Sequence, residues 1–511
     1  MQVELLDFLI DETANHNVYS RALIDNGEVI VRPFTSEELK YFPNRVDLNE
    51  NTKSIFLSLE TRELKRFSQI RVIEDVRRSV FIMELFEVEH TKMLKKTLLE
   101  LAEFFRINLY VEKIFFSEKF GLGDKTNSVK EYDQNFFEYK KVWDSKQGLI
   151  LTAGPSITPI EVAYAQDAAR NGWNAKWRDY LVLFEKEFAS YVGSKYAIAT
   201  SSCTGALQIS LMALGIGKGD EVLVPDLTWV SSATAILDTG ATPVFVDVEI
   251  DSWNICVSSL KEKLTDKTKA IIPVHMYGGP ARMDEIIKFA RKHNLFVVED
   301  AACAIGAKWM GKSAGTFGEF GCFSFQGAKL LVTGEGGMIV TDNKRLYQKA
   351  LKIWDQGREE TKTFWINEKG VKFKMSNVQA AIGLAQIRRA DTNIKLKRRL
   401  FKWYEKRLDH CLDLVMNKEI EGAKSTYWMT SIRLTENARV SRDQLISYLK
   451  ENNIDSRPVF PAISQYPIWG TQLQSCVNAK KIGQTAINLP SGVSLSESQI
   501  EYICDTIIKV V

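Results

Sequence analysis

The 511-residue sequence predicts an α/β protein: a mostly parallel sheet with helices on both faces, a small C-terminal α+β domain and an extra N-terminal α+β domain. In the middle of the chain, apolar runs alternate with amphipathic stretches, as in the strand expected at 270–275, the helix at 283–293 and the strand at 295–298. This alternation is typical of a parallel sheet covered on both faces. From about residue 377 long helices follow, and then a strand at 428–434. We therefore expect three domains, at residues 1–147, 148–390 and 391–511.

Composition and charge exclude several classes of protein. The chain is 45% hydrophobic and 26% charged, as in an ordinary soluble protein, and its net charge of +3 comes without a long basic block, so we expect neither a nucleic-acid nor a membrane partner. Seven scattered cysteines without close pairs argue against zinc and disulfides and favour a reducing compartment. The start, MQVELLDFLIDE, lacks a basic leader, and no apolar run approaches the roughly 18 residues of a membrane helix. We expect a cytoplasmic protein without a metal.

Lys329 has the most informative surroundings in the chain. It follows an apolar run at 321–325 that predicts a short buried strand, and it precedes a glycine-rich stretch at 334–337 and a second strand at 338–341. A lysine can become a covalent catalyst when its amine forms a Schiff base with an aldehyde cofactor. Most lysines are solvated surface residues, so the hypothesis depends on the segments upstream.

Asp300 ends the apolar run that begins at residue 295, which is typical of a buried parallel strand. A carboxylate at the carboxyl end of such a strand can face a pyridine nitrogen and keep it protonated. Functional groups gather at these strand ends in open α/β sheets. The alternative is an aspartate that caps the next helix.

Two further segments follow predicted strands. Residues 201–208, SSCTGALQ, open an amphipathic run, and small residues at a helix start leave backbone N–H groups free for a phosphate. An ordinary serine or threonine cap would look the same. Trp229 follows the strand expected at 221–224 and could lie flat over a cofactor ring, although a single tryptophan is more often a core residue.

Together these motifs resemble the DegT/StrS family of sugar aminotransferases, within the fold-type-I pyridoxal phosphate (PLP) enzymes. The resemblance covers roughly 70% of the chain, from about Ala153 to the C-terminus. It rests on ordered segments that include AGPSITPIEVAYAQDAARNGWN, TSSCTGALQISLMALGIGKGDEVLVPDLTWV, VVEDAACAIGA, CFSFQGAKLLVTGEGGMIVTDN and IDSRPVFPAISQYPIW. Within the family, KAIIPVHMYGGPARMD and KMSNVQAAIGLAQ are most similar to GDP-perosamine synthase-like members.

The resemblance implies a PLP site and a role for each matching residue. Lys329 would be the Schiff-base lysine and the general acid and base, and Asp300 the partner of the pyridine nitrogen. Trp229 would stack on the ring. The phosphate would be bound by backbone donors and a hydroxyl, from Thr204, Gly205 and Ser324.

This chain departs from the family pattern at three places. Cys303 stands where Gln, His or Glu usually lies near the ring hydroxyl, and a thiol donates only weakly. Lys372 stands where asparagine is frequent, in a segment that reaches the phosphate of the partner subunit, so the resemblance implies a homodimer with shared sites. A solvated lysine beside Lys374 is the alternative. Ser464 replaces a histidine of some members in the C-terminal motif that also contains Arg457, and both are candidates for contacting the substrate.

The first 147 residues contain strand-like runs at 28–31, 54–59, 80–86 and 109–116, with a helical stretch at 94–105 before the last of them. This order faintly resembles the C-terminal half of a GNAT acetyltransferase. The glycine motif that holds the coenzyme A pyrophosphate is missing, because the helix follows acidic residues at 87–92. We favour a degenerate, non-catalytic module for assembly or substrate access, joined by a polar connection at 124–144.

The function implied by the resemblance is transamination of a nucleotide-linked keto sugar, best a 4-keto-6-deoxyhexose, with L-glutamate as donor, for surface polysaccharide or a related glycan. Three alternatives remain. Sugar dehydratases of the family replace the lysine by histidine, and Lys329 argues against them. A bifunctional enzyme would need an N-terminal acetyltransferase activity. A non-catalytic binding protein on this fold should lack Lys329 or Asp300, and the chain has both.

Overall fold

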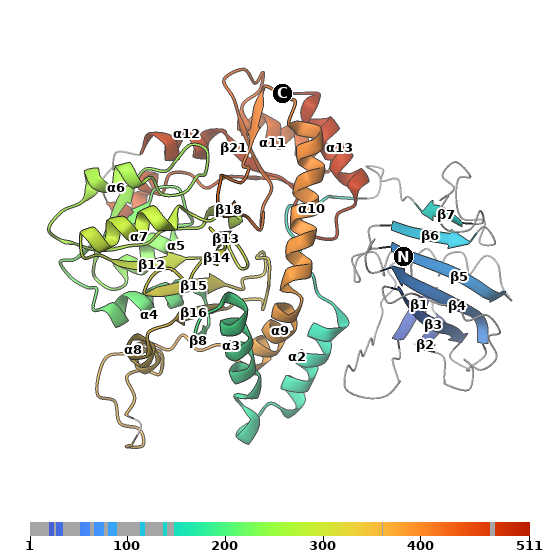
Figure 1. The fold of residues 1–511 in the computed structure, drawn as a ribbon, viewed down its shortest axis with the longest axis horizontal. Helices are drawn as coiled ribbons and strands as arrows, with labels where there is room; N and C mark the ends of the chain where they lie inside the picture. Colours follow the sequence, from blue (N-terminus) through green and yellow to red (C-terminus); the bar gives the residue numbers. More distant parts are fainter. Residues whose placement is uncertain are drawn as a thin grey trace. The chain divides into compact units, whose positions relative to one another are not determined.

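The computed structural model describes residues 148–359, 361–470 and 476–511, and the backbone of seven strands between residues 20 and 139 (Figure 1). Contacts divide the chain into two compact units, Met1–Val142 with Ile157–Ala163, and Trp143–Ser156 with Tyr164–Val511. In the part of the chain that is described, no helix is both long and apolar enough to cross a membrane. No group of three or more metal-binding side chains occurs among the same residues.

The strands before residue 140 form one sheet in chain order. They are β1 (Ser20–Ile24), β2 (Gly27–Pro33), β3 (Thr52–Thr61), β4 (Arg66–Asp75), β5 (Val80–Val88), β6 (Lys113–Ser117) and β7 (Phe136–Tyr139). Neighbours are antiparallel except β5 and β6, which are parallel. The helix expected at 94–105 lies outside the described residues.

Two sequence-based expectations for this sheet need correction. The segment 124–144 is more than a polar connection, because β7 lies within it and pairs with β6. Strands β1 and β4 were not expected at all. Their alternating apolar residues are fewer and are interrupted by charge, as in RFSQIRVIED of β4, so period-two patterning alone did not identify them.

The second unit is built on a seven-stranded sheet with the order β10-β9-β11-β12-β15-β16-β8. From β10 to β15 all neighbours are parallel, and β16 is antiparallel to both β15 and β8. The strands are β8 (Tyr196–Thr200), β9 (Glu221–Pro225), β10 (Thr242–Val246), β11 (Thr268–Ile271), β12 (Phe296–Asp300), β15 (Phe320–Ser324) and β16 (Gly337–Thr341). The mostly parallel sheet expected from the sequence is therefore present.

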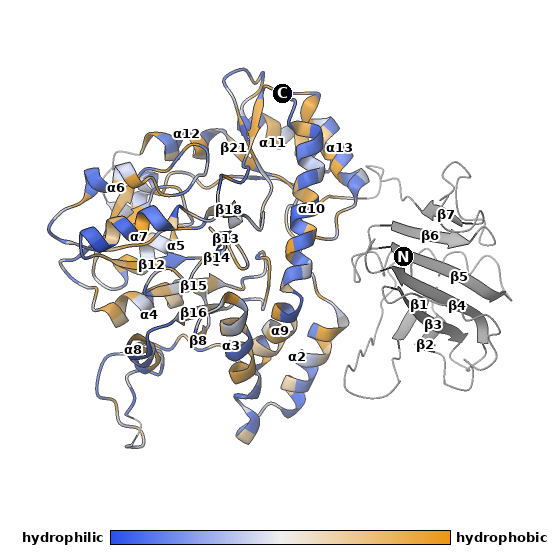
Figure 2. Ribbon diagram, viewed as in Figure 1, coloured by the Kyte–Doolittle hydropathy of each residue, from blue (hydrophilic) through white to orange (hydrophobic). Residues whose placement is uncertain are grey.

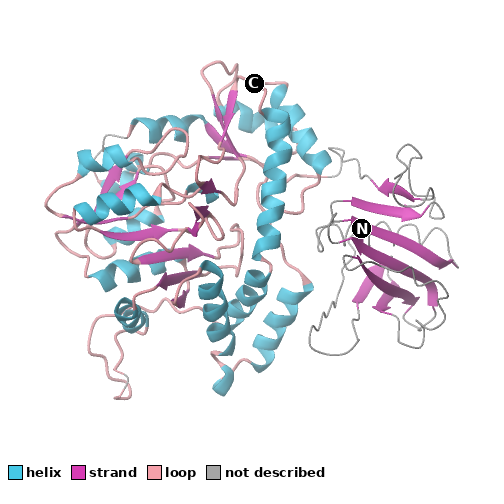
Figure 3. Ribbon diagram, in the orientation of Figure 1, coloured by secondary structure: helices cyan, strands magenta, loops and turns pink. Residues whose placement is uncertain are grey.

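Helices cover both faces of this sheet (Figure 3), because successive side chains of each strand point to opposite faces. In β16, Ile339 packs in one apolar cluster with α4 (Cys203–Leu214), α5 (Ser231–Leu237) and α8 (Lys344–Trp354). Its neighbour Met338 packs in another with α3 (Asp179–Val192) and α9 (Asn377–Arg388). A third cluster joins strand residues to α6 (Val257–Lys263) and α7 (Met283–Lys292). Figure 2 shows apolar colour concentrated in the strands and mixed stripes on the helices.

The C-terminal part begins with the long helix α10 (Ala390–Leu408), which follows α9 directly. Its antiparallel sheet has the order β17-β19-β21-β20, from Leu414–Met416, Ser431–Leu434, Ala486–Asn488 and Arg457–Pro458. Helices α11 (Arg442–Glu451), α12 (Val477–Thr485) and α13 (Glu497–Ile508) complete it. The strand expected at 428–434 begins only at Ser431, so Trp428 lies before the strand.

Short elements connect these parts. A three-stranded sheet, β14-β13-β18, pairs Lys312–Ser313 and Lys308–Trp309 of the large domain with Ala423–Lys424 of the small one. Among the described residues, the remaining helix is α2 (Pro159–Asn171), and the 3₁₀ helices are η4 (Asn174–Lys176), η5 (Met276–Gly278), η6 (Ile463–Gln465) and η7 (Pro467–Trp469). Helix α9 begins at a capping box in which Ser376 and Gln379 bind each other's backbone N–H groups, and this fixes the end of the 370–377 segment.

Candidate active site

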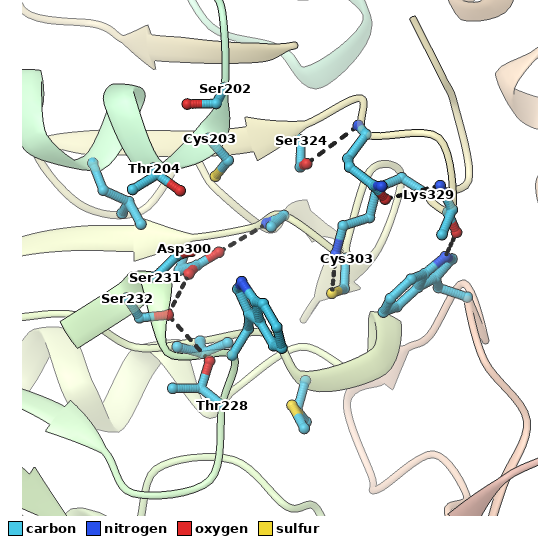
Figure 4. Close-up of a pocket in the computed structure, with 18 of the residues that line it drawn as sticks. Ser202, Cys203, Thr204, Thr228, Ser231, Ser232, Asp300, Cys303, Ser324 and Lys329 are labelled. Atoms are coloured by element: carbon cyan, nitrogen blue, oxygen red, sulfur yellow. Dashed lines mark hydrogen bonds between the residues drawn. The ribbon is translucent and has the colours of Figure 1, made fainter. Parts of the chain in front are cut away.

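A cavity of about 500 Å³ lies at the carboxyl ends of β9, β12 and β15 and at the N-terminus of α4 (Figure 4). In open α/β sheets this edge is where ligands bind. Six of the residues expected from the sequence line the cavity: Thr204, Trp229, Asp300, Cys303, Ser324 and Lys329. The topology therefore brings together side chains that are up to 125 positions apart (329 − 204) in the chain.

Lys329 lies in the turn that follows β15. Its backbone N–H donates to the carbonyl of Gln326, and its Nζ lies 3.2 Å from Sγ of Cys303. The same Nζ lies 4.0 Å from the centre of the Trp428 ring. Figure 4 shows Lys329 and Cys303 pointing toward one another inside the cavity. The amine is thus held at a defined position within the cavity.

Asp300 ends β12 and is only 6% exposed. Its Oδ2 accepts a hydrogen bond of 2.7 Å from the hydroxyl of Ser232, and its Oδ1 accepts one from the backbone N–H of Ala302 at 3.1 Å. Thr228 Oγ1 lies 3.1 Å from Ser232 Oγ. These contacts fix the direction of the carboxylate. Ser232 and Thr228 were not expected from the sequence, although both lie close to Trp229 in the segment TWVSS.

The backbone behind Asp300 is held by a buried pair, His275 and Glu299. Glu299 accepts backbone N–H groups of Gly315 and Gly318 at 2.8 Å, and its Oε2 lies 3.0 Å from Nε2 of His275. His275 Nδ1 accepts from the backbone of the next loop, so its Nε2 carries the proton given to Glu299. The backbone N–H of His275 also donates to the carbonyl of Asp300 at 3.0 Å. Neither side chain lines the cavity, and both stabilise the strand end that carries the aspartate.

The N-terminus of α4 forms the other end of the cavity. Ser202, Cys203 and Thr204 line it, and the first N–H groups of a helix together with its dipole attract an anion. The N–H of Gly205 donates to Oγ of Ser202 at 3.1 Å, and Gly205 is outside the lining. A Cβ at position 205 would lie 2.8 Å from the Phe373 ring, so glycine permits this segment to approach closely. In this structure, Gly205 allows the start of α4 to pack against Phe373.

Aromatic side chains and neutral thiols form part of the cavity wall. Trp229 is 56% exposed at the cavity edge, and its ring lies 5.5 Å from that of Phe460. Burial raises the pKa of the Cys303 thiol, and the nearby Lys329 offsets part of this effect. Burial also raises the pKa of Cys203 well above its usual value. Both thiols are therefore neutral at neutral pH.

Besides Gly205, three further expected residues do not line this cavity. Ser464 is buried, and its hydroxyl donates to Oδ2 of Asp226 at 2.8 Å. Arg457 is exposed and pairs with Asp455 at 3.3 Å. Lys372 is exposed, and its expected contact is with a partner subunit. The cavity also contains Trp428 and Phe460 of the C-terminal part, which the sequence analysis did not single out.

The residues present fit PLP. An anion-binding helix end, a buried carboxylate and an amine line one cavity, and they match the phosphate, the ring nitrogen and the aldehyde of the cofactor. The hydroxyl of Ser324, at the end of β15, lines the same cavity. The space of about 500 Å³ leaves room for a substrate beside the cofactor.

Comparison with known proteins gives the family. The family model for DegT/DnrJ/EryC1/StrS aminotransferases matches residues 155–508. The chain belongs to this family. Its members are PLP-dependent, which agrees with the chemistry of the cavity. The expected family, fold class, cofactor and aminotransferase activity are thereby confirmed.

Individual relatives agree with this assignment. GDP-perosamine synthase of Escherichia coli O157:H7 is 42% identical over 353 residues, which are 69% of this chain and 96% of that protein. An aminotransferase from Psychrobacter cryohalolentis has a similar structure, with a TM-score of 0.66 and 29% identity, over 70% of this chain and 97% of its own. Spr1654 of Streptococcus pneumoniae, solved in a PLP form, has a TM-score of 0.65 at 24% identity over 70% and 97% of the two chains and shows the shared fold.

Proposed function

We propose that this aminotransferase converts a nucleotide-linked keto sugar, best a 4-keto-6-deoxyhexose, to an amino sugar with L-glutamate as the amino donor. The observation that carries the proposal is the 42% identity to a GDP-perosamine synthase along 96% of that protein. The product would serve a surface polysaccharide or a related glycan. The side chains in the cavity support the reaction class, and the relative supports the class of sugar.

The proposal gives each residue of the cavity a role. When bound, PLP supplies an aldehyde that takes up an amino group and a ring that withdraws electrons from the reacting carbon. Lys329 holds the cofactor through Nζ, and Asp300 keeps a proton on the ring nitrogen. Trp229 covers the ring. The phosphate is bound at the N-terminus of α4 beside Thr204 and by the hydroxyl of Ser324.

Lys329 then has a second role, as the group that moves a proton. With the cofactor bound, Nζ of Lys329 would be the group that takes a proton from the amino donor and returns one during the transfer. The same steps in reverse order place the amino group on the sugar. Asp300 is held by Ser232 and Ala302, and its negative charge stabilises the protonated ring nitrogen while the ring withdraws electrons. Water must be excluded, and the apolar wall of Trp229, Phe460 and Trp428 supports this.

The proposal extends to the assembly. We infer a cytoplasmic homodimer in which residues 370–377 of one subunit reach the phosphate bound by the other, with Lys372 as the contact. Lys372 is exposed and so is accessible to a partner, whereas Lys374 pairs with Asp355 of its own chain. We keep the domain limits at residues 147 and 390, and we assign residues 1–147 to assembly or substrate access. The single parallel strand pair in their sheet, β5 with β6, supports a degenerate GNAT-like module.

The test combines candidate substrates with a labelled donor. Purified protein is incubated with nucleotide-linked 4-keto-6-deoxyhexoses and ¹⁵N-labelled L-glutamate, and products are read by mass spectrometry. The proposal expects ¹⁵N in the sugar and 2-oxoglutarate as coproduct, with none from the Lys329→Ala control. A product that has lost water without gaining nitrogen would identify a dehydratase. Binding of the sugar without any turnover would identify a non-catalytic protein.

A further inference from the structure

Trp428 contacts the lysine segment twice, although it comes from the C-terminal part of the chain. Its indole N–H donates to the carbonyl of Ala328 at 2.7 Å, directly before the lysine. Its ring centre lies 4.0 Å from Nζ of Lys329. An amine over an aromatic face at this distance is attracted to it, and the protonated form is attracted most. Trp428 therefore contacts both the backbone and the reactive atom of the lysine segment.

The position of the ring is fixed from behind. The carbonyl of Trp428 accepts a hydrogen bond of 2.8 Å from Nζ of Lys397, a buried lysine of α10 that also donates to the carbonyl of Ser491. The ring packs against Tyr277, with 5.8 Å between the ring centres and 30° between the planes. Tyr277 is itself buried, and its hydroxyl accepts from Asn488 at 3.1 Å. Such support holds a functional side chain in one geometry.

We propose that Trp428 is a positioning residue that holds the amine of Lys329 whenever this amine is not bonded to the cofactor. The proposal rests on the role of Lys329 proposed above. In this state Nζ lies between the ring and Sγ of Cys303, which is 3.2 Å away. When Nζ takes a proton from the reacting carbon, –NH₂ becomes –NH₃⁺ and the ring face stabilises the new charge. Delivery of the proton to the cofactor carbon restores –NH₂, so protons and charge balance.

A purely structural role for Trp428 makes a different prediction. The residue is 5% exposed and belongs to the main apolar cluster, so its replacement would cost stability in any case. In that case, replacing Trp428 would not change the pH dependence of a reaction of Lys329. The experiment must therefore read the state of the amine as well as turnover.

The variants are Trp428→Leu, which removes the ring, and Trp428→Phe, which keeps a ring face but loses the N–H donor. The matched control is Trp403→Leu in α10, where the ring lies 5.0 Å from the guanidinium carbon of Arg399 and does not line the cavity. Each protein is freed of its cofactor, checked by circular dichroism, and mixed with PLP at a series of pH values. The rate of recombination is followed by visible absorption, because only the neutral amine attacks the aldehyde.

The expected result is a shift in the pH midpoint of recombination. Without the ring face, the ratio of ammonium to neutral amine falls about two- to thirty-fold at a given pH. The recombination midpoint of Trp428→Leu therefore moves roughly 0.4 to 1.5 pH units lower than that of the wild type. Trp428→Phe should lie between this variant and the wild type, and Trp403→Leu should match the wild type. In a single turnover of the loaded enzyme with L-glutamate, Trp428→Leu should be slower by a similar factor.

Two outcomes would overturn the inference. If Trp428→Leu remains folded and its recombination profile coincides with that of the wild type, the ring does not hold the amine, whatever the activity. If Trp428→Phe, which is the less disruptive change, behaves as Trp428→Leu in both assays, the ring face is not the cause. Borohydride reduction of each loaded protein separates this failure from that of the proposed function. A label on a lysine other than Lys329 would overturn both.

Discussion

Asp300 and Lys329 reach the cavity from adjacent strands of the large sheet, whereas Trp428 and Phe460 reach it from loops of the C-terminal part. The first pair supplies charge and a nucleophilic amine at strand ends, where parallel topology always places the functional edge. The second pair supplies aromatic surface that fixes and covers those groups. Under the proposed function, the large domain would carry the chemistry and the small domain would control its geometry. Each prediction below tests one side of this division.

The largest effect is expected at Lys329. Lys329→Ala removes the covalent bond to the cofactor and the group that moves the proton, so turnover should fall by roughly four or more orders of magnitude. The fold should remain, because the side chain is only half-buried. Steady-state assays with circular dichroism measure both. Borohydride reduction of the wild type followed by peptide mapping should label Lys329, and near-normal activity of the variant would contradict its role.

The next largest effect is expected at Asp300. Asp300→Asn keeps the shape and the contact with Ser232 but replaces the charge by a neutral amide, which cannot hold a proton on the ring nitrogen. Turnover should fall by about two to four orders of magnitude. The visible spectrum of the loaded variant should also differ from that of the wild type. A variant with the wild-type spectrum and rate would place the ring nitrogen elsewhere.

The large-domain side of the site could be predicted from sequence because its residues follow recognisable strands. Thr204, Trp229, Asp300, Ser324 and Lys329 each lie one turn or less from the end of an apolar run, and the parallel sheet aligns these ends. Local pattern singled out Lys329, Asp300, Trp229 and the segment 201–208, and the family resemblance added Ser324 and the individual roles. The antiparallel direction of β16 and the edge position of β8 could not be inferred this way, because strand direction and order depend on long-range pairing.

The small-domain side could not be predicted, because its positions depend on packing between distant segments. Trp428 looked like the first residue of a strand, yet the strand begins three positions later and the ring turns to Ala328. Ser464 lies in a motif expected near the sugar, but a buried carboxylate, Asp226, takes its hydroxyl. Burial raises the pKa of Asp226, and its contacts with this loop offset part of that effect. The periodicity of apolar residues in the sequence does not predict such contacts between distant segments.

A further effect, smaller than those at Lys329 and Asp300, concerns the expected contact between subunits. Lys372→Ala should lower turnover about 10- to 100-fold if its amine binds the phosphate of the neighbouring site. Mixing this protein with Lys329→Ala, after dissociation and reassembly, should restore activity. Half of the dimers would be hybrids with one intact site each, so up to about a quarter of the wild-type sites return.

The unmixed proteins are the controls for that experiment, and subunit exchange is confirmed by mass. Fully exchanged dimers that stay inactive would show that each subunit completes its own site. The exposed Lys372 would then be an ordinary solvated lysine without a role in the neighbouring site. An active protein that sediments as a monomer would have the same meaning.

The smallest effect concerns the buried Lys397, which links α10 to Trp428, and it appears in stability. Burial lowers the pKa of Lys397 to about 7, from the 10.5 of an ordinary lysine. Between these values the unfolded chain binds a proton that the folded protein does not, so stability should rise with pH, by up to about 1.4 kcal/mol per unit from this group. Lys397→Met should remove this part of the slope. It also leaves the carbonyls of Trp428 and Ser491 without their donor, which costs a constant amount at every pH.

Urea unfolding between pH 7.5 and 9.5 separates the two contributions, because only the slope reports the proton. Lys402→Met, an exposed lysine of the same helix, is the matched control and should keep the wild-type slope. If Lys397→Met also keeps that slope, the amine is charged in the folded protein and the link to Trp428 is a charged contact. A lost slope together with a normal single turnover would show that the small domain tolerates a looser Trp428. A lost slope with a slower turnover would show that the buried amine of Lys397 and the amine of Lys329 are connected through the Trp428 ring.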